Sequence, residues 1–401
     1  MIARRTTRLA VLTAALAAGC GGAPAPRAGG PATGLAVVNS DFSTTSLSLL
    51  DASGTLVRPD CVDSATGATG GATKTISGDV VLPSQPQPGG DVILVDRGNG
   101  ALTFVDPTTC TIVRQIPVPG VKTNPHDVVV LAPDKAYVTR YDLNLAVSDP
   151  DLAGNDVAII DPGSGARLGR ISLDAYASPG SGATVLARPD RALRVDGQVI
   201  VSLNEIDQKF ATYGEGKLVV VDPDTDTVTA AVALTGLANC EGMTYVAAHD
   251  LLLVACGGPF AGSTAQSGLA VVDVSVSPPV LARVVPSAAF DGRPLDMGWV
   301  LEAPAAAGGT SAFAVTNDPN DVGPDALFLL DYVAGTTQPV ATSGPYTFGT
   351  PVGLAGLLLV PNATRAAPRI DRFDLTAAPA PAGSLTSDPV TNLPPQSMAP
   401  Y

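Results

Sequence analysis

The chain has 401 residues and a formal net charge of −14 at pH 7, from 37 acidic and 23 basic residues. Apolar residues make up 45% of it and charged residues only 15%, and Gly (42) and Pro (36) are abundant. The acidic balance and the lack of a Lys/Arg cluster exclude a nucleic-acid-binding protein, whereas this composition is typical of many short strands separated by turns around a large core.

The first twenty residues have the pattern of an export signal. Three arginines among the first eight residues precede an apolar stretch over residues 9–18, which is too short to span a bilayer, and small residues then lead to Cys20. This segment resembles the bacterial lipoprotein signal. The resemblance implies a signal peptide over residues 1–19, lipidation of Cys20 and, because no Asp follows the Cys, an exported lipoprotein of the outer membrane that faces the periplasm or the surface. Ordinary signal cleavage nearby is the alternative.

Residues 20–33 are mostly Gly, Pro and Ala and lack core-forming side chains. Such a composition predicts a flexible tether. A single folded domain is then expected over residues 34–401.

Four further cysteines are Cys61, Cys110, Cys240 and Cys256. Export permits disulfides, and three pairings are possible. Cys240 and Cys256 are equidistant from a predicted turn near Ala248, so they should face each other across a hairpin at a distance that suits a disulfide. The pair Cys61–Cys110 then follows by elimination. None of the four has the spacing of a metal site.

A short pattern recurs along the chain: an apolar run, then an Asp and a turn. Its seven copies end at Asp51, Asp106, Asp161, Asp222, Asp273, Asp331 and Asp374, mostly 51 to 61 residues apart. Another apolar strand precedes each copy and a further one follows most of them, so each unit contains about four short strands. Seven such units predict an all-β fold, a seven-bladed β-propeller of four-stranded blades.

The two ends of the chain are expected to complete one blade together. The N-terminal unit begins at its second strand, and the C-terminal "TNLPPQSMAPY" resembles "TNPHDVVVLAP", which opens the third unit. We therefore predict that residues 395–401 supply the innermost strand of the first blade, which would close the ring and leave no strand edge bare.

The segments "NPHDVVVLAPDKAYVTRYD" and "KLVVVDPDTDTVTAAVAL" resemble the YVTN-type repeat of quinoprotein amine dehydrogenase-like β-propellers. The resemblance covers most of residues 34–401 and is specific for architecture. It does not fix an activity, because propellers include enzymes, binding proteins and scaffolds.

Enlarged polar loops between second and third strands should share one face with the loops that enter the innermost strands. Long loops on one face favour a binding surface; drift in the length of exposed loops is the alternative. Aligning the innermost strands places six residues at the channel mouth: Ile76, His126, Gly182, Glu241, Met297 and Leu393. The candidates for ligand binding on this face are His126, Arg140, Asp142, Glu205, Asp207, Glu241 and Asp296. His126 and Glu241 are also weak candidates for an acid–base pair; the alternative for His126 is a role in starting the strand.

One acidic loop has weak calcium candidates. Asp318, Asn320 and Asp325 surround a Gly, and the loop over residues 149–156 has a similar composition. Calcium needs six to eight oxygen ligands, and neither loop has EF-hand spacing. Asx-turns are the alternative explanation.

The favoured hypothesis is a non-catalytic lipoprotein, anchored to the membrane by its lipid, that binds a protein or an envelope polymer through its acidic loop face and needs no cofactor. The sequence has only two histidines and lacks a CxxCH haem site and a GxSxG elbow. The alternative is a propeller enzyme, a lactonase-like hydrolase or a quinoprotein-type oxidoreductase, with its site at the channel mouth. A third possibility is a purely structural scaffold.

Overall fold

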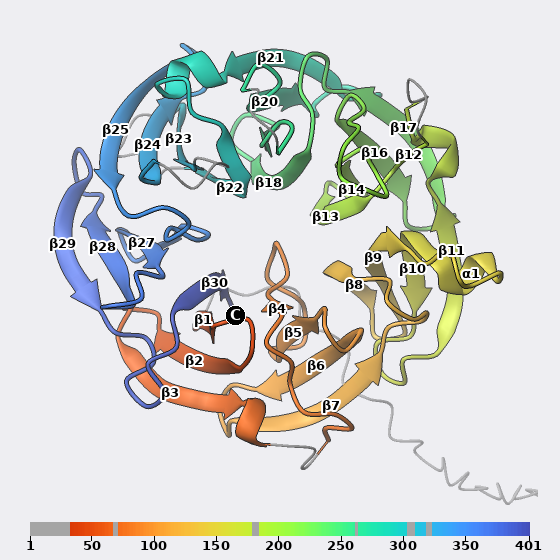
Figure 1. Cartoon of the computed structure of the whole chain (residues 1–401), viewed down its shortest axis with the longest axis horizontal. Coiled ribbons are helices and arrows are strands. Elements are labelled where there is room, and N and C mark those ends of the chain that lie inside the picture. The colour runs from red at the N-terminus through yellow and green to blue at the C-terminus, as the bar shows by residue number, and fades with distance from the viewer. Residues whose placement is uncertain (1–32, 67–70, 179–183, 261–263, 303–308, 318–322) are drawn as a thin grey trace, which may run out of the picture.

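The computed structural model describes residues 33–66, 71–178, 184–260, 264–302, 309–317 and 323–401, apart from the side chains of residues 296–300 and 302. Seven four-stranded antiparallel sheets form a ring around a central channel (Figure 1). The predicted seven-bladed β-propeller is thus confirmed.

Each blade runs from an innermost strand beside the channel to an outermost strand at the rim. Blades 1 to 3 consist, in this order, of β30 (Pro395–Pro400), β1 (Gly34–Ser40), β2 (Thr45–Asp51) and β3 (Leu56–Asp63); β4 (Val80–Val81), β5 (Val92–Asp96), β6 (Ala101–Asp106) and β7 (Thr111–Pro117); and β8 (Pro125–Ala132), β9 (Lys135–Leu143), β10 (Gly154–Ile160) and β11 (Arg167–Ser172).

Blades 4 to 7 follow the same order. They consist of β13 (Pro189–Val195), β14 (Gln198–Leu203), β16 (Lys217–Asp222) and β17 (Thr227–Ala233); β18 (Cys240–Val246), β19 (Leu251–Cys256), β20 (Gly268–Asp273) and β21 (Val280–Pro286); β22 (Leu295–Glu302), β23 (Ser311–Thr316), β24 (Ala326–Asp331) and β25 (Thr336–Thr342); and β26 (Val352–Leu354), β27 (Leu357–Asn362), β28 (Arg369–Asp374) and β29 (Ala380–Leu385). The remaining elements are β12 (Val185–Leu186) paired with β15 (Ile206–Asp207), helix α1 (Pro150–Ala153) and the 3-10 turns η1 (Ser64–Thr66), η2 (Asp174–Tyr176) and η3 (Ser287–Phe290).

The antiparallel order gives the ring two different faces. On one face, which we call the upper face, lie the loops that enter the innermost strands and the loops that join second to third strands. On the lower face lie the turns that join first to second strands and third to fourth strands. None of the helices in the described part of the chain is long and apolar enough to cross a membrane.

The recurring aspartates explain why the repeat is visible in the sequence. Each of the seven ends or directly follows the third strand of its blade. Its Oδ1 accepts a hydrogen bond from the backbone N–H two residues further on, at 2.7 to 2.9 Å in all seven turns. Such Asx-turns lead the chain into the fourth strand on the lower face. In Asp106, the bond from the Thr108 N–H is the main reason why the pKa of the carboxyl group is lowered.

The core lies between adjacent blades. Strands β1, β5 and β10 are buried along their whole length, because a blade in a ring has a neighbour on both faces. Phe104 of blade 2, for example, packs with Val128 and Val138 of blade 3 in one apolar cluster. Burial on both faces explains why these strands are continuous apolar runs rather than alternating ones.

The C-terminal strand closes the ring, as predicted. β30 pairs antiparallel with β1, with Leu35 opposite Pro400 and Val37 opposite Met398. The backbone N–H of Thr33 donates to the carbonyl of Tyr401 at 2.7 Å. Met398 is buried in a cluster that blade 1 shares with blade 7, so the tail joins the two ends of the ring.

Both predicted disulfides are present. Cys240 and Cys256 lie directly opposite each other on β18 and β19, with a Cα separation of 3.9 Å. Cys61 on β3 is joined to Cys110 in the β6–β7 turn, which links the rims of blades 1 and 2. Two disulfides are typical of a protein that folds outside the cytoplasm.

Removal of residues 395–401 should open the ring. It would leave the inner edge of β1 unpaired and take Met398 out of the core, and loss of one buried methionine side chain alone costs about 2–5 kcal/mol. We expect a large decrease in the free energy of unfolding, measured by urea denaturation, and a larger hydrodynamic radius. A synthetic peptide of residues 394–401, added in excess, should restore part of the loss. Unchanged stability of the truncated chain would contradict closure by β30.

Candidate functional site

Three innermost strands begin with the same dipeptide pattern, a Pro followed by a polar residue. In blade 3 this is Pro125-His126, in blade 4 it is Pro189-Asp190 and in blade 1 it is Pro395-Gln396. The innermost strand of blade 4 therefore does not begin near Gly182, which lies outside the described residues. Asp190 has the position in blade 4 that His126 has in blade 3.

The other aligned residues are at varied positions. Glu241 is the second residue of β18 and is buried. Ile76 precedes β4 and is a core residue, and Leu393 precedes β30. Asp296 and Met297 are in β22, but their side chains lie outside the described part.

His126 has Asp190 as its main partner. Its Nδ1 lies 2.9 Å from Asp190 Oδ1, and its ring stacks on Tyr141 with 4.2 Å between centroids. Burial would raise the pKa of Asp190, but the charge and hydrogen bond of His126, with help from Arg191, lower it to about 2. His126 Nε2 is buried and has no hydrogen-bond partner among the described residues.

Arg188 extends this network to the loop of blade 4. Its buried guanidinium group lies over the rings of Tyr141 and Phe210, 4.8 and 4.2 Å from their centroids, and its Nη1 lies 2.5 Å from Asp142 Oδ1. Burial and then the nearby carboxylate of Glu241 raise the pKa of Tyr141 far above its usual range. The network thus joins two predicted residues, His126 and Asp142, through Tyr141 and Arg188, which were not predicted.

Three of the remaining candidates, Arg140, Glu205 and Asp207, have other partners. Arg140 donates to both carboxylate oxygens of Asp156 at 2.7 and 2.6 Å and is fully buried. Glu205 accepts the Ser178 N–H, and its pKa is raised mainly by burial. Asp207 accepts two backbone N–H groups of its own loop.

Glu241 is held by an amide. Asn204 Nδ2 donates to Glu241 Oε1 and to Asn239 Oδ1, both at 2.9 Å. In all these groups the acidic side chains are held by nearby cations, amides or backbone donors, and Glu241 also lies close enough to Tyr141 to raise its pKa.

Of the three calcium candidates, only Asp325 lies among the described residues. Asp318 and Asn320 lie outside the described residues. The carboxylate of Asp325 accepts the backbone N–H groups of Tyr346, Thr347 and Phe348 at 2.6 to 3.0 Å. The described residues contain no group of three or more His, Cys, Asp or Glu side chains that could hold a metal ion.

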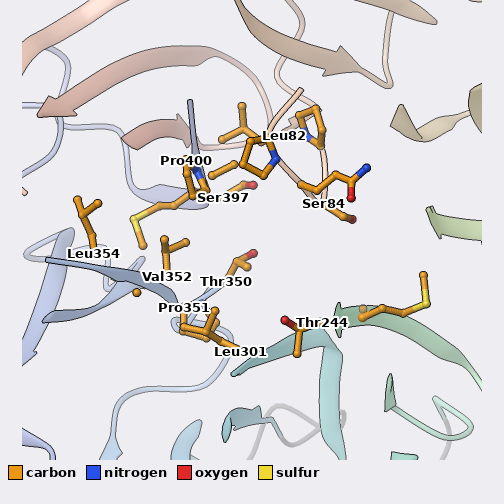
Figure 2. Close-up of a pocket in the computed structure, with 18 of the residues that line it drawn as sticks. Leu82, Ser84, Thr244, Leu301, Thr350, Pro351, Val352, Leu354, Ser397 and Pro400 are labelled. Carbon is orange, nitrogen blue, oxygen red and sulfur yellow. The ribbon is translucent and has the colours of Figure 1, made fainter. Parts of the chain in front are cut away.

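A cavity that was not predicted from the sequence lies in the lower half of the channel. It has a volume of about 730 Å³ and is lined by residues from six blades. Figure 2 shows Leu82, Thr244, Leu301 and Val352 around this open space. The signal for it was the long β4–β5 connection over residues 82–91, "LPSQPQPGGD", where the other lower turns are mostly short.

This connection lies along the inner edges of two other blades. Gln87 Oε1 accepts the Val130 N–H of blade 3 at 2.8 Å. Gln85 Oε1 accepts the Arg194 N–H of blade 4 at 3.1 Å, and the Ser84 N–H donates to the buried Asp127. The loop thus covers blade 3 and forms a fixed wall of the cavity.

The second missed feature is an exposed aromatic set on the upper face. In the described part of the chain, four aromatic side chains are exposed: Phe42, Phe210, Phe260 and Tyr346. All four are in upper-face loops, from blades 1, 4 and 5 and from the connection between blades 6 and 7. Phe210 and Phe260 contact each other with 6.3 Å between ring centroids.

No family model matches the sequence, and no curated protein is significantly similar to it. Among solved structures, the chain is similar to a putative 6-phosphogluconolactonase from Bacteroides uniformis, with 12% identity, a TM-score of 0.56 and coverage of 91% of this chain and 99% of that one. It is also similar to the dihydro-heme d1 dehydrogenase NirN in complex with DHE, with 12% identity, a TM-score of 0.54 and coverage of 91% of this chain and 66% of that one. At these identities the similarity shows the propeller fold alone.

Replacement of Asp190 by Asn should change the pH dependence of stability. A carboxyl group whose pKa is lowered on folding, here to about 2 from about 3.9 in the unfolded chain, stabilises the native state above the unfolded value. This contribution is lost as the pH falls from about 4 towards 2. Urea denaturation should therefore show a large deficit for Asp190→Asn near neutral pH that shrinks through this window. The exposed Asp134, replaced by Asn, is the control. A deficit that stays constant on acidification would refute the His126–Asp190 coupling.

Proposed function

We propose that the chain is an exported, non-catalytic propeller that binds a protein partner through its upper face. The observation that carries the proposal is that Phe42, Phe210, Phe260 and Tyr346, all the exposed aromatic side chains of the described residues, lie on this one face. Aromatic residues are enriched at protein interfaces and contribute much of their binding energy. Outer-strand positions, which cover a large area, have exposed Val and Leu but no exposed aromatic residue in the described part.

The backbone at these positions supports a role beyond folding. Phe42, Phe210 and Tyr346 have φ values of 65°, 56° and 49°, in the left-handed region that favours Gly. The Phe42 loop is closely packed, because a Cβ atom on Gly78 would lie 2.4 Å from the Phe42 carbonyl carbon. Gly at these positions would relieve the strain of the left-handed backbone. That exposed aromatic side chains stand there instead is consistent with selection for a contact with another molecule.

The polar network favours binding over catalysis. General acid–base or nucleophilic chemistry needs a base within reach of a proton or nucleophile. Among the described contacts, the imidazole of His126 meets the Asp190 carboxylate and the Tyr141 ring, its backbone carbonyl accepts from Arg191, and no Ser, Thr or Cys is hydrogen-bonded to it. Arg188 is covered by Phe210. The network therefore serves best as a rigid support for the loops above it.

The leader and the disulfides support export, and we propose that Cys20 is lipidated and anchors the chain to the outer membrane. Replacement of Cys20 by Ser should move the protein from the membrane to the soluble fraction and remove the mass of the lipid from the purified chain. A Cys20→Ser protein that stays in the membrane fraction would refute the anchor without affecting the proposed binding face.

The binding face can be tested with the triple variant Phe42→Ser, Phe260→Ser and Tyr346→Ser. Phe210 is left in place because it covers Arg188. The partner is first captured from the envelope fraction of the source cells by cross-linking, then purified, and its Kd is measured. We expect the triple variant to weaken binding about ten-fold or more.

The matched control is Val57→Ser, Leu168→Ser and Val280→Ser, three exposed apolar residues of outer strands, which should leave the Kd nearly unchanged. Phe42→Gly and Tyr346→Gly should weaken binding while keeping or raising the melting temperature, because Gly relieves the left-handed backbone. Equal Kd values for the triple variant and the wild type would refute the proposal, as would capture that survives protease treatment of the fraction, which would indicate a polysaccharide.

A further inference from the structure

The lower channel cavity is a separate feature from the upper face. Its apolar wall includes Leu82, Leu193, Met243, Leu301, Val352 and Met398. A volume of about 730 Å³ lies within the range of sites that bind small organic molecules.

The charges of the lining differ from those of the chain. The chain has 37 acidic and 23 basic residues, yet the described side chains that line the cavity include Arg191 and Arg194 and no Asp or Glu. In an acidic protein, a cavity whose described lining has two arginines and no acidic side chain favours an anion.

The two arginines differ in whether an acidic side chain of the protein already pairs with them. Arg191 Nε lies 3.4 Å from Asp190 Oδ1, and its Nη1 donates to the carbonyl of His126. Arg194 forms no ion pair with any described residue, and its side chain is exposed. Its backbone is nevertheless held in place, because the backbone N–H donates to Gln85 of the loop over residues 82–91. Arg194 is therefore the cation that is available to a ligand.

We propose that the lower channel binds a small apolar molecule with one anionic group, a carboxylate or a sulfonate. Its hydrocarbon part would lie against the Leu, Met and Val wall, and its anion would pair with Arg194. The loop over residues 82–91 is held by Gln85, Gln87 and Ser84, so the site is formed before the ligand arrives, which lowers the cost of binding. This site is independent of the proposed protein-binding face.

Two fluorescent probes with the same hydrocarbon framework test the proposal. 8-Anilinonaphthalene-1-sulfonate carries an anion, and N-phenyl-1-naphthylamine does not. The wild-type protein should bind one molecule of the sulfonate per chain. Arg194→Gln should weaken its binding about ten-fold, the usual effect of losing one charge-assisted contact, and should leave the neutral probe nearly unaffected. Arg58→Gln, which removes an exposed charge from the outer strand β3, is the matched control and should change neither.

A second variant tests whether the probes occupy the cavity itself, by filling the cavity instead of changing its charge. Thr244→Trp places a large ring in the space seen in Figure 2 and should reduce the binding of both probes; Thr229→Trp, on the exposed outer strand β17, should not. The triple upper-face variant should bind both probes like the wild type. Sulfonate binding that is unchanged in Arg194→Gln, or lost only in the upper-face variant, would overturn the proposal. Because Arg194 is exposed, its variant decides the question even if Thr244→Trp fails to fold.

Discussion

The pairing of the last strand with the first is the interaction on which the rest of the structure depends. β30 supplies the innermost strand of blade 1, and its Met398 joins the core of blade 1 to that of blade 7. Residues 397–400 also form part of the cavity wall. Without this strand the ring has a gap, the cavity loses one side and the upper loops lose their common frame. A few hydrogen bonds between residues more than 350 positions apart therefore hold together both of the proposed binding surfaces.

The fold could be predicted in detail because its signals are local. Each recurring Asp makes its turn through a bond to a backbone N–H two residues away, so the same short pattern marks every blade. The Cys240–Cys256 pair followed from the symmetry of a hairpin. The innermost strands were harder to place. In blade 4 the small sheet of β12 and β15 lies next to the start of β13. The predicted innermost strand was therefore placed at Gly182, although β13 begins at Pro189.

Individual candidate residues could be chosen from the sequence by their type, but their interaction partners could not. His126 was identified as a polar residue at the channel mouth, but its partner Asp190 is 64 residues away in the next blade. The cavity depends on the bond between Gln85 and Arg194, 109 residues apart. No periodicity or spacing in one sequence contains such pairs. Likewise, the identity of Phe42 or Tyr346 is visible in the sequence, whereas its exposure depends on how seven blades pack.

The position of the chain ends has a further consequence. Thr33 is bonded to Tyr401 where β1 begins and β30 ends, at the lower rim of blade 1. A support that holds the protein by its N-terminal segment is therefore attached at the lower face. The aromatic rim then points away from the support, and the channel opening points towards it. The proposed protein partner and the proposed channel ligand would therefore approach from opposite faces and would not compete.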